Sequence, residues 1–241
     1  MDGNVRGLVL GLAAIGSIVV GGAIAWFWGR TPAAGKPEYP VQAGVATVDP
    51  EDGFKAPATL PDGSIRSVTG TWENGNDRMV EYHRKDGTLT CTMQFYENGR
   101  KERELIPIGT DAAPRVLERG WFESGEPQFV YEKTGDQLDG PYLLYWPTGF
   151  PKGQGAYKAS MKDGVWQVWN DRGIRTETAE FAAGVPHGMH RLLNEFGAPL
   201  ESGRFDHGTK VGEWLYYDGA NADNITRETY PEAGVGPVTT P

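Results

Sequence analysis

The stretch GVWQVWNDRG, residues 164–173, decides the fold. Residues 165–169 are rich in aromatic and β-branched side chains, which favour an extended strand. Residues 170–173 supply Asn, Asp and Gly, which accept positive φ or cap their own backbone and therefore favour a tight turn. A second strand is expected over residues 174–181. The stretch therefore predicts one β-hairpin.

The same hairpin recurs along the chain with a step of 24 residues. Glycines keep this step in two separate sets, at 140, 164, 188 and 212 and at 125, 149, 173 and 197. Ring positions keep it too, at Tyr157, Phe181 and Phe205. A fixed period of this length is typical of a repeat array, in which each unit completes the core of its neighbour.

Weaker copies extend the period upstream. The string 72–75 (WENG) and the string 96–99 (YENG) are 24 residues apart, as are Gly63 and Gly87. Between Gly87 and Gly125 the step is 38, one period plus 14. Residues 106–114 are therefore expected to belong to an insertion or to a degenerate unit. Short strands joined by short turns predict an antiparallel meander that forms a long, narrow, twisted sheet.

Residues 164–169 followed by Gly173 and Phe181, and residues 212–219, resemble the bacterial MORN-variant repeats. That family has a glycine, an aromatic-rich strand, an Asn-Gly or Asp-Gly turn and a strand that ends in Tyr or Phe. The likeness covers residues 63–230, is strongest over 140–217, and departs from the pattern at His190, Leu193 and Asn221. The resemblance implies elongated β-hairpin arrays that mediate protein association, some of them antitoxins, and implies no catalytic residue.

Near the N-terminus, residues 7–29 run for 23 residues without a charge. As a helix they would reach about 34 Å, enough to cross a hydrocarbon core of about 30 Å. Trp26, Phe27 and Trp28 suit the headgroup level. We predict a transmembrane helix here, and the alternative is a secretory signal cleaved after Ala25. The predicted fold class is therefore an all-β, elongated antiparallel meander of tandem 24-residue β-hairpin repeats, preceded by one transmembrane α-helix.

Small residues recur along this segment at a four-residue spacing, which lets another helix approach closely. The predicted helix-packing residues are Gly7, Gly11, Ser17 and Gly21; alternatively, small residues are simply tolerated in an anchor. Positive charges on both sides of the segment leave the orientation undecided. Because export behind an N-terminal anchor is common, we expect a single-pass protein of the bacterial cell membrane with a periplasmic or otherwise extracytoplasmic soluble domain.

The predicted organisation has five parts. Prolines and few aliphatic residues after the helix favour an extended linker, and the C-terminal end is similarly polar. The parts are a short flank at 1–6, the transmembrane helix at 7–29, a Pro-rich linker at 30–61, the repeat domain at 62–230 and a flexible tail at 231–241.

Composition excludes one class of partner. The net charge of −9 repels phosphate backbones, so we expect no nucleic-acid partner. The lone Cys91 cannot form an internal disulfide and is expected to be a small buried residue.

No residue pattern predicts catalysis, a cofactor or a metal. The sequence lacks a nucleophile elbow, a phosphate-binding loop and a His-Glu-x-x-His helix. His187 and His190 are three residues apart, and on a strand they would point to opposite faces. The scattered carboxylates, such as Glu118, Glu177 and Glu201, cannot be paired. We therefore predict no catalytic, cofactor-binding or metal residues, and a protein that is not an enzyme.

The repeated rings are expected to line one face, partly packed between repeats and partly available for contact. The predicted contact residues are Tyr142, Tyr145, Trp166, Trp169, Trp214 and Tyr217. We expect a membrane-anchored protein-interaction or scaffold module, an accessory or structural subunit of a complex with other membrane-protein subunits. The alternative is a free-standing envelope binding protein, antitoxin-like or specific for glycan or protein, that uses this aromatic face.

Overall fold

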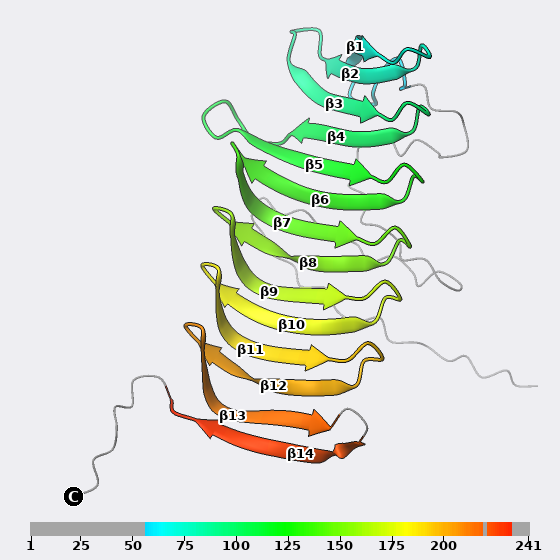
Figure 1. The fold of residues 1–241 in the computed structure, drawn as a ribbon. Coiled ribbons are helices and arrows are strands. Elements are labelled where there is room, and N and C mark those ends of the chain that lie inside the picture. The colour runs from blue at the N-terminus through cyan, green and yellow to red at the C-terminus, as the bar shows by residue number, and fades with distance from the viewer. Residues whose placement is uncertain (1–55, 219–220, 233–241) are drawn as a thin grey trace, which may run out of the picture.

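The computed structural model describes residues 56–218 and 221–232, which form one long antiparallel sheet of 14 strands (Figure 1). The strands lie across the sheet in chain order, so each one pairs with its neighbours in sequence. They are β1(Ile65–Thr71), β2(Asp77–His83), β3(Leu89–Phe95), β4(Lys101–Pro107), β5(Arg115–Trp121), β6(Pro127–Thr134), β7(Gln137–Tyr145), β8(Pro151–Lys158), β9(Met161–Trp169), β10(Arg175–Ala182), β11(Val185–Leu193), β12(Pro199–Asp206), β13(Thr209–Asp218) and β14(Asn221–Tyr230).

The predicted fold class, which joined a transmembrane helix to the hairpin array, is corrected. The described residues are all-β, and among them no helix is long and apolar enough to cross a membrane. The physical reason is the sequence period: in residues 56–232 a turn interrupts the chain about every 12 residues, so backbone hydrogen bonds are completed between strands. The predicted helix at 7–29, with Gly7, Gly11, Ser17 and Gly21, lies outside the described residues.

The two long edges of the sheet carry different turns. At the right-hand edge of Figure 1, the turn after β7 closes with a hydrogen bond from Gly149 N to the Trp146 carbonyl at 2.8 Å. At the left-hand edge, from β6 onward, two-residue turns place residues such as Ala159 and Ala183 at a φ of 49°. This left-handed conformation matches the twist of the flanking strands. One turn of each kind makes up one 24-residue repeat.

The turns along the right-hand edge also bond to one another. Trp72 Nε1 donates to the Phe95 carbonyl at 2.9 Å, and Trp146 Nε1 donates to the Trp169 carbonyl at 3.0 Å. Each acceptor lies 23 residues after its donor and precedes the next turn on the same edge. At these two places the bond joins one repeat to the following one.

The structure also changes the interpretation of residues 106–114. Ile106 and Pro107 belong to β4, and residues 108–114 form the loop before β5, where Ile108 N donates to the Arg115 carbonyl. Gly87 follows β2 on one edge, whereas Gly125 follows β5 on the other edge. The 38-residue step between them thus spans one and a half repeats, or 36 residues, plus two extra ones, rather than an inserted unit.

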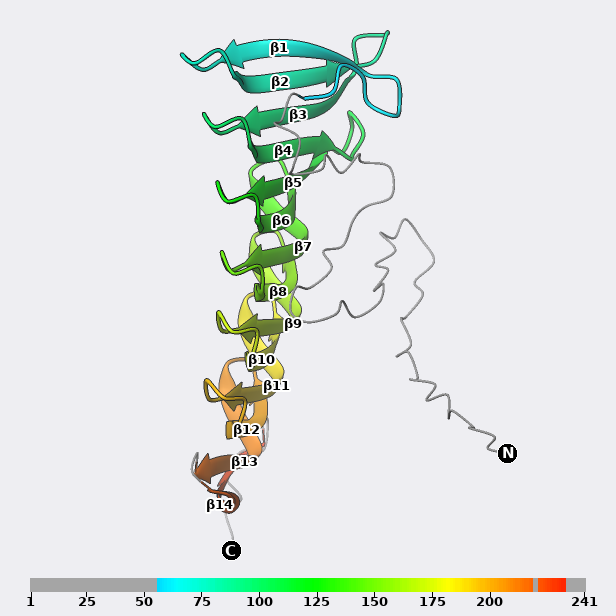
Figure 2. The same cartoon turned by 90° about the vertical axis from the view of Figure 1, so that its right-hand side faces the viewer.

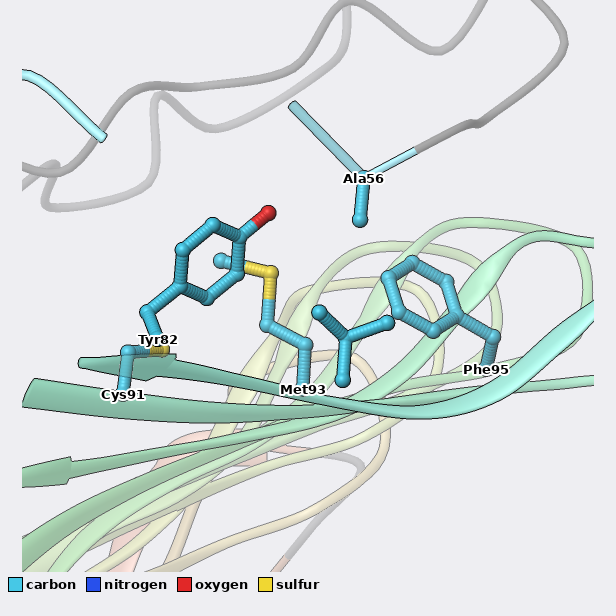
Figure 3. Close-up of a cluster of buried hydrophobic side chains, with 6 residues drawn as sticks. Ala56, Tyr82, Cys91, Met93 and Phe95 are labelled. Atoms are coloured by element: carbon cyan, nitrogen blue, oxygen red, sulfur yellow. The ribbon is translucent and has the colours of Figure 1, made fainter. Parts of the chain in front are cut away.

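A second layer covers the sheet near its N-terminal end. Thr59 pairs with Ile65, and the segment 56–60 passes over one face of β2–β4 (Figure 3). Part of the predicted linker therefore contributes to the core. The buried cluster consists of Ala56, Val80, Tyr82, Cys91, Met93 and Phe95, with Leu60 and Ile106 packed against it. The burial of Cys91 confirms its prediction.

Figure 2 shows how the sheet continues below this cluster. The broad faces of β1–β4 are turned toward the viewer, whereas most of the later strands are seen nearly edge-on, because the sheet twists along its length. Within the described residues, β5–β14 form a single layer. Side chains on both faces of this part must therefore be buried by their neighbours in the same sheet.

Candidate binding surfaces

The six predicted contact residues are divided between the two faces of the sheet. Residues three apart in a strand point to opposite sides. Tyr142, Trp166 and Trp214 lie on one side, which we name the ring face. Three residues after each of these, Tyr145, Trp169 and Tyr217 lie on the other side, which we name the reverse face. The structure thus separates the first three from the second three, and of the first three it brings only Tyr142 and Trp166 into ring contact, with centroids 5.7 Å apart.

On the ring face, each tryptophan lies flat over a glycine of the preceding strand. A Cβ added at Gly155 would lie 2.4 Å from the Trp166 ring, and one added at Gly203 would lie 2.2 Å from the Trp214 ring. The indole nitrogens donate to the Ala156 and Arg204 carbonyls, both at 3.1 Å. Because glycine has no side chain, the ring reaches the backbone itself. The two sites are 48 residues apart, two repeats.

Other rings and lysines enclose the tryptophans. Phe205 meets the Trp214 ring edge-on with centroids 5.0 Å apart, and Tyr157 meets Trp166 in the same way at 4.9 Å. The Lys210 ammonium lies 3.9 Å from the centroid of the Trp214 ring. Trp214 is consequently 0% exposed and Trp166 is 6% exposed. These rings stabilise the sheet and leave almost no indole surface for a partner.

A polar group lies beside Trp214 on the ring face. His190 Nε2 is 3.4 Å from the Glu177 carboxylate, and its Nδ1 is 3.6 Å from the Glu201 carboxylate. The hydrogen bond from His190 lowers the pKa of Glu177 below its ordinary value. The His190 Nδ1 atom is buried without a hydrogen-bond partner. The row connects β10, β11 and β12, and His190 replaces the ring expected in this repeat.

The polar row continues to the last strand. Lys210 Nζ lies 3.5 Å from Glu201 and donates to the Tyr216 hydroxyl at 3.0 Å. Tyr216 and Tyr230 share a hydrogen bond at 3.1 Å, and Tyr230 donates to Glu228 at 2.6 Å. The hydrogen bond to Glu228 raises the pKa of Tyr230. Each of these groups is bonded to its neighbour, so the row is suited to joining strands.

Three buried carboxylates lie between β4 and β6, and each has a cationic partner. Glu104 is 3.3 Å from Arg119, Glu118 is 3.1 Å from Lys133, and Glu132 is paired with Arg115. Burying a carboxylate without such a partner would be costly. Glu104 is opposite Arg119 and Glu132 is opposite Leu117, and these two positions of β5 lie on one face. Glu118 lies between them on β5 and therefore points to the other face.

The reverse face exposes apolar side chains over β9 and β11. Val165 is 54% exposed and Met189 is 55% exposed. Met161 and Val185 are also exposed, and each is four residues before one of the first pair in its own strand. None of the four was predicted from the sequence, because only aromatic residues were proposed as contact residues. One signal was present in the sequence: Val165 and Met189 are 24 residues apart and therefore occupy equivalent positions of successive repeats.

The structure brings together one metal-ligand group that the sequence reasoning also missed. His187, Asp206 and His207 place one ligand atom each within 4.8 Å of one another. His187 lies on the reverse face, and His190 lies on the ring face, so these two histidines do not meet. Gly188 pairs with Phe205, which puts the next residues, His187 and Asp206, side by side. The sequence carries no signal for this approach, because it depends on the pairing register between β11 and β12.

No protein-family model matches the chain, and no curated protein sequence matches it. The resemblance to the MORN-variant repeats therefore stays a prediction. The hairpin meander itself is observed.

Proposed function

We propose that the chain is a protein-interaction module, a structural or accessory subunit of a larger complex, which a partner protein contacts on the reverse face of β9–β11. The observation that carries this proposal is the exposed apolar group on that face. Large apolar side chains that gather on a protein surface mark interaction sites. Scattered single ones carry no such meaning.

The four side chains mark the corners of one patch on the reverse face, with Asp163 and His187 between them along the two strands. β9 and β11 both pair with β10, so their axes are about 9.6 Å apart. Within each strand the two apolar residues are separated by four positions, or about 13 Å. The corners of the patch are Met161, Val165, Val185 and Met189.

The chemistry of the patch defines its partner. Between the two apolar pairs runs β10, where Glu180 lies opposite Val165 and Thr178 lies opposite Gln167. The patch is therefore apolar at its corners and carries polar groups between them, including the Glu180 carboxylate and the His187 imidazole. A partner surface with aliphatic or aromatic side chains around a Lys or Arg would complement it, because a buried carboxylate needs a cation.

The aromatic face supports the alternative function less well. A free-standing protein that binds glycan or protein by its rings needs exposed ring surface, and Trp166 and Trp214 offer almost none. The membrane localisation, the membrane-protein partners and the absence of enzymatic activity stay predictions. The first two depend on residues outside the described ranges.

The proposal is tested by purifying the tagged full-length chain in mild detergent from its own cells and quantifying co-purified proteins by mass spectrometry. The variant Val165→Glu/Met189→Glu places two charges on the patch. Its matched control is Ile65→Glu/Val68→Glu, which changes two exposed apolar residues of β1 in the same way. Circular dichroism checks that both fold.

We expect a stoichiometric partner with the unmodified chain and with the control, and at least a tenfold lower amount with the β9/β11 variant, because a buried unpaired charge costs more than about 1.4 kcal/mol. Equal recovery with both variants, or no stoichiometric partner at all, would contradict the proposal.

A further inference from the structure

The geometry points to a binding site for a first-row divalent transition metal ion, such as Zn²⁺, formed by His187, Asp206 and His207. His187 Nδ1 lies 3.2 Å from Asp206 Oδ1, and His207 Nδ1 lies 2.7 Å from the same oxygen. Ligands at about 2.0–2.2 Å from one tetrahedral ion are about 3.4 Å apart, and closer in octahedral geometry. The three ligand atoms therefore need to move little to surround one ion.

The backbone holds these side chains in place. His187 is at the start of β11, and Asp206 ends β12. His207 occupies the two-residue turn after β12, with a φ of 48°. The next residue, Gly208, donates its N–H to the Pro186 carbonyl at 2.8 Å, so the turn is bonded to the residue that precedes His187. The fold thus sets the separation of the two histidines along the backbone.

The donor set selects the class of metal. Two imidazole nitrogens and one carboxylate oxygen suit Zn²⁺, Ni²⁺ and Cu²⁺, whereas Ca²⁺ and Mg²⁺ prefer sites made only of oxygen ligands. His187 is 46% exposed and His207 is 84% exposed, so an ion can enter from solvent and keep water in its remaining positions. The nearby Arg204 guanidinium does not compete for Asp206, because it lies 2.8 Å from Glu232.

The preceding repeat supplies an internal comparison. Its two-residue turn has the same conformation, with Ala183 at a φ of 49°, and Gly184 N donates to the Lys162 carbonyl at 2.8 Å. The positions equivalent to His187, Asp206 and His207, 24 residues earlier, are Asp163, Ala182 and Ala183. The same frame recurs one repeat earlier still, where Ala159 has a φ of 49° and Ser160 N donates to the Leu138 carbonyl at 2.8 Å. Of these three copies, only the last carries three ligands.

Isothermal titration of the full-length chain with ZnCl₂ tests the site directly. We expect one equivalent to bind to the unmodified chain and to His83→Ala, which alters a partly exposed histidine of β2 far from the site. His187→Ala and His207→Ala should each weaken binding by at least about 100-fold, since even an outer partner of a metal ligand commonly contributes 10-fold to 100-fold. Binding that is unchanged in these two variants, or absent from the unmodified chain, would overturn the assignment.

Transfer of the ligands provides the second test. The variant Asp163→His/Ala182→Asp/Ala183→His places the three ligands on the preceding frame, and should raise the stoichiometry from one Zn²⁺ to two. A folded triple variant that still binds one ion would show that the frame does not create the site. If circular dichroism shows that this variant is unfolded, the outcome is decided by the comparison of His187→Ala with His83→Ala.

Discussion

The two ends of the sheet bury their side chains in different ways. At β2–β4 the reverse face is covered by residues 56–60, and Tyr82 and Val80 are fully buried beneath this segment (Figure 3). At β12–β14 the described residues provide no such cover on the ring face, yet Trp214 is just as buried. It is enclosed by Gly203 below, by Phe205 at its edge and by Lys210 above.

This difference shows that a single sheet can bury a large ring without a second layer, provided that the neighbouring strand offers glycine and the ring's own strand offers a long cationic side chain. Lysine does so because its methylene chain and ammonium both cover the ring. Each arrangement is confined to one end of the array, the first to residues 56–106 and the second to residues 190–230. Each end of the array is therefore expected to respond to mutation on its own, as in other repeat proteins.

The largest effect is expected from removing the central ring of the C-terminal arrangement. Trp214→Ala should destabilise β12–β14 by about 3–5 kcal/mol, since it leaves a cavity and an unmatched Arg204 carbonyl. Hydrogen exchange followed by mass spectrometry should show lost protection in β12–β14 while β2–β4 stay protected. Phe95→Ala should instead remove protection from β2–β4 and leave β12–β14 protected. Lost protection across both ends in either variant would show that the ends are coupled.

A smaller effect is expected from filling the space under the same ring. Gly203→Ala should cost about 1–3 kcal/mol, because the new Cβ would meet the Trp214 ring. Gly153→Ala is the matched control, because a Cβ at this strand position meets nothing within 4 Å. Urea unfolding should separate the two variants. Equal urea midpoints for the two variants would mean that packing of the Trp214 ring does not require glycine at position 203.

At the N-terminal end, one hydroxyl ties the covering segment to the sheet. Tyr82 donates to the Pro57 carbonyl at 2.7 Å, so Tyr82→Phe should cost about 1 kcal/mol. Tyr216→Phe is expected to cost less, because Tyr216 is only partly buried, whereas Tyr82 is fully buried, so water can replace the Tyr216 hydroxyl. A larger shift of the urea midpoint for Tyr216→Phe would reverse this order.

The smallest expected effect is a loss of stability at alkaline pH, which is absent at neutral pH. Burial raises the pKa of Tyr82, Tyr131 and Tyr145 from 10.0 to about 12. Between pH 10 and 12 the unfolded chain loses these protons and the folded chain keeps them, so stability should fall as the pH rises through this window. Absorbance at 295 nm should show a late tyrosine fraction, and Tm should fall from pH 9 to pH 11. A flat Tm would contradict this.

The sequence was informative where the period repeats without a break. Residues 164–173 predicted a strand and a turn, and β9 with the turn at 170–174 agrees with that local prediction. The 38-residue step from Gly87 to Gly125 was misleading, because it was interpreted as an insertion or a degenerate unit. The two glycines lie at opposite edges of the sheet and so belong to different sets. A period reports how often a turn occurs, but not on which edge it lies.

Sequence by itself determined the alternation of strand and turn, since β-branched and aromatic residues favour strands and Asn, Asp and Gly favour turns irrespective of distant contacts. Only the tertiary structure decided which side chains meet. The division of the six aromatic contact residues between two faces, the burial of Trp214 and the approach of His187 to Asp206 and His207 all depend on register. Register is set by pairing between strands, and a shift of one residue would move every side chain to the other face.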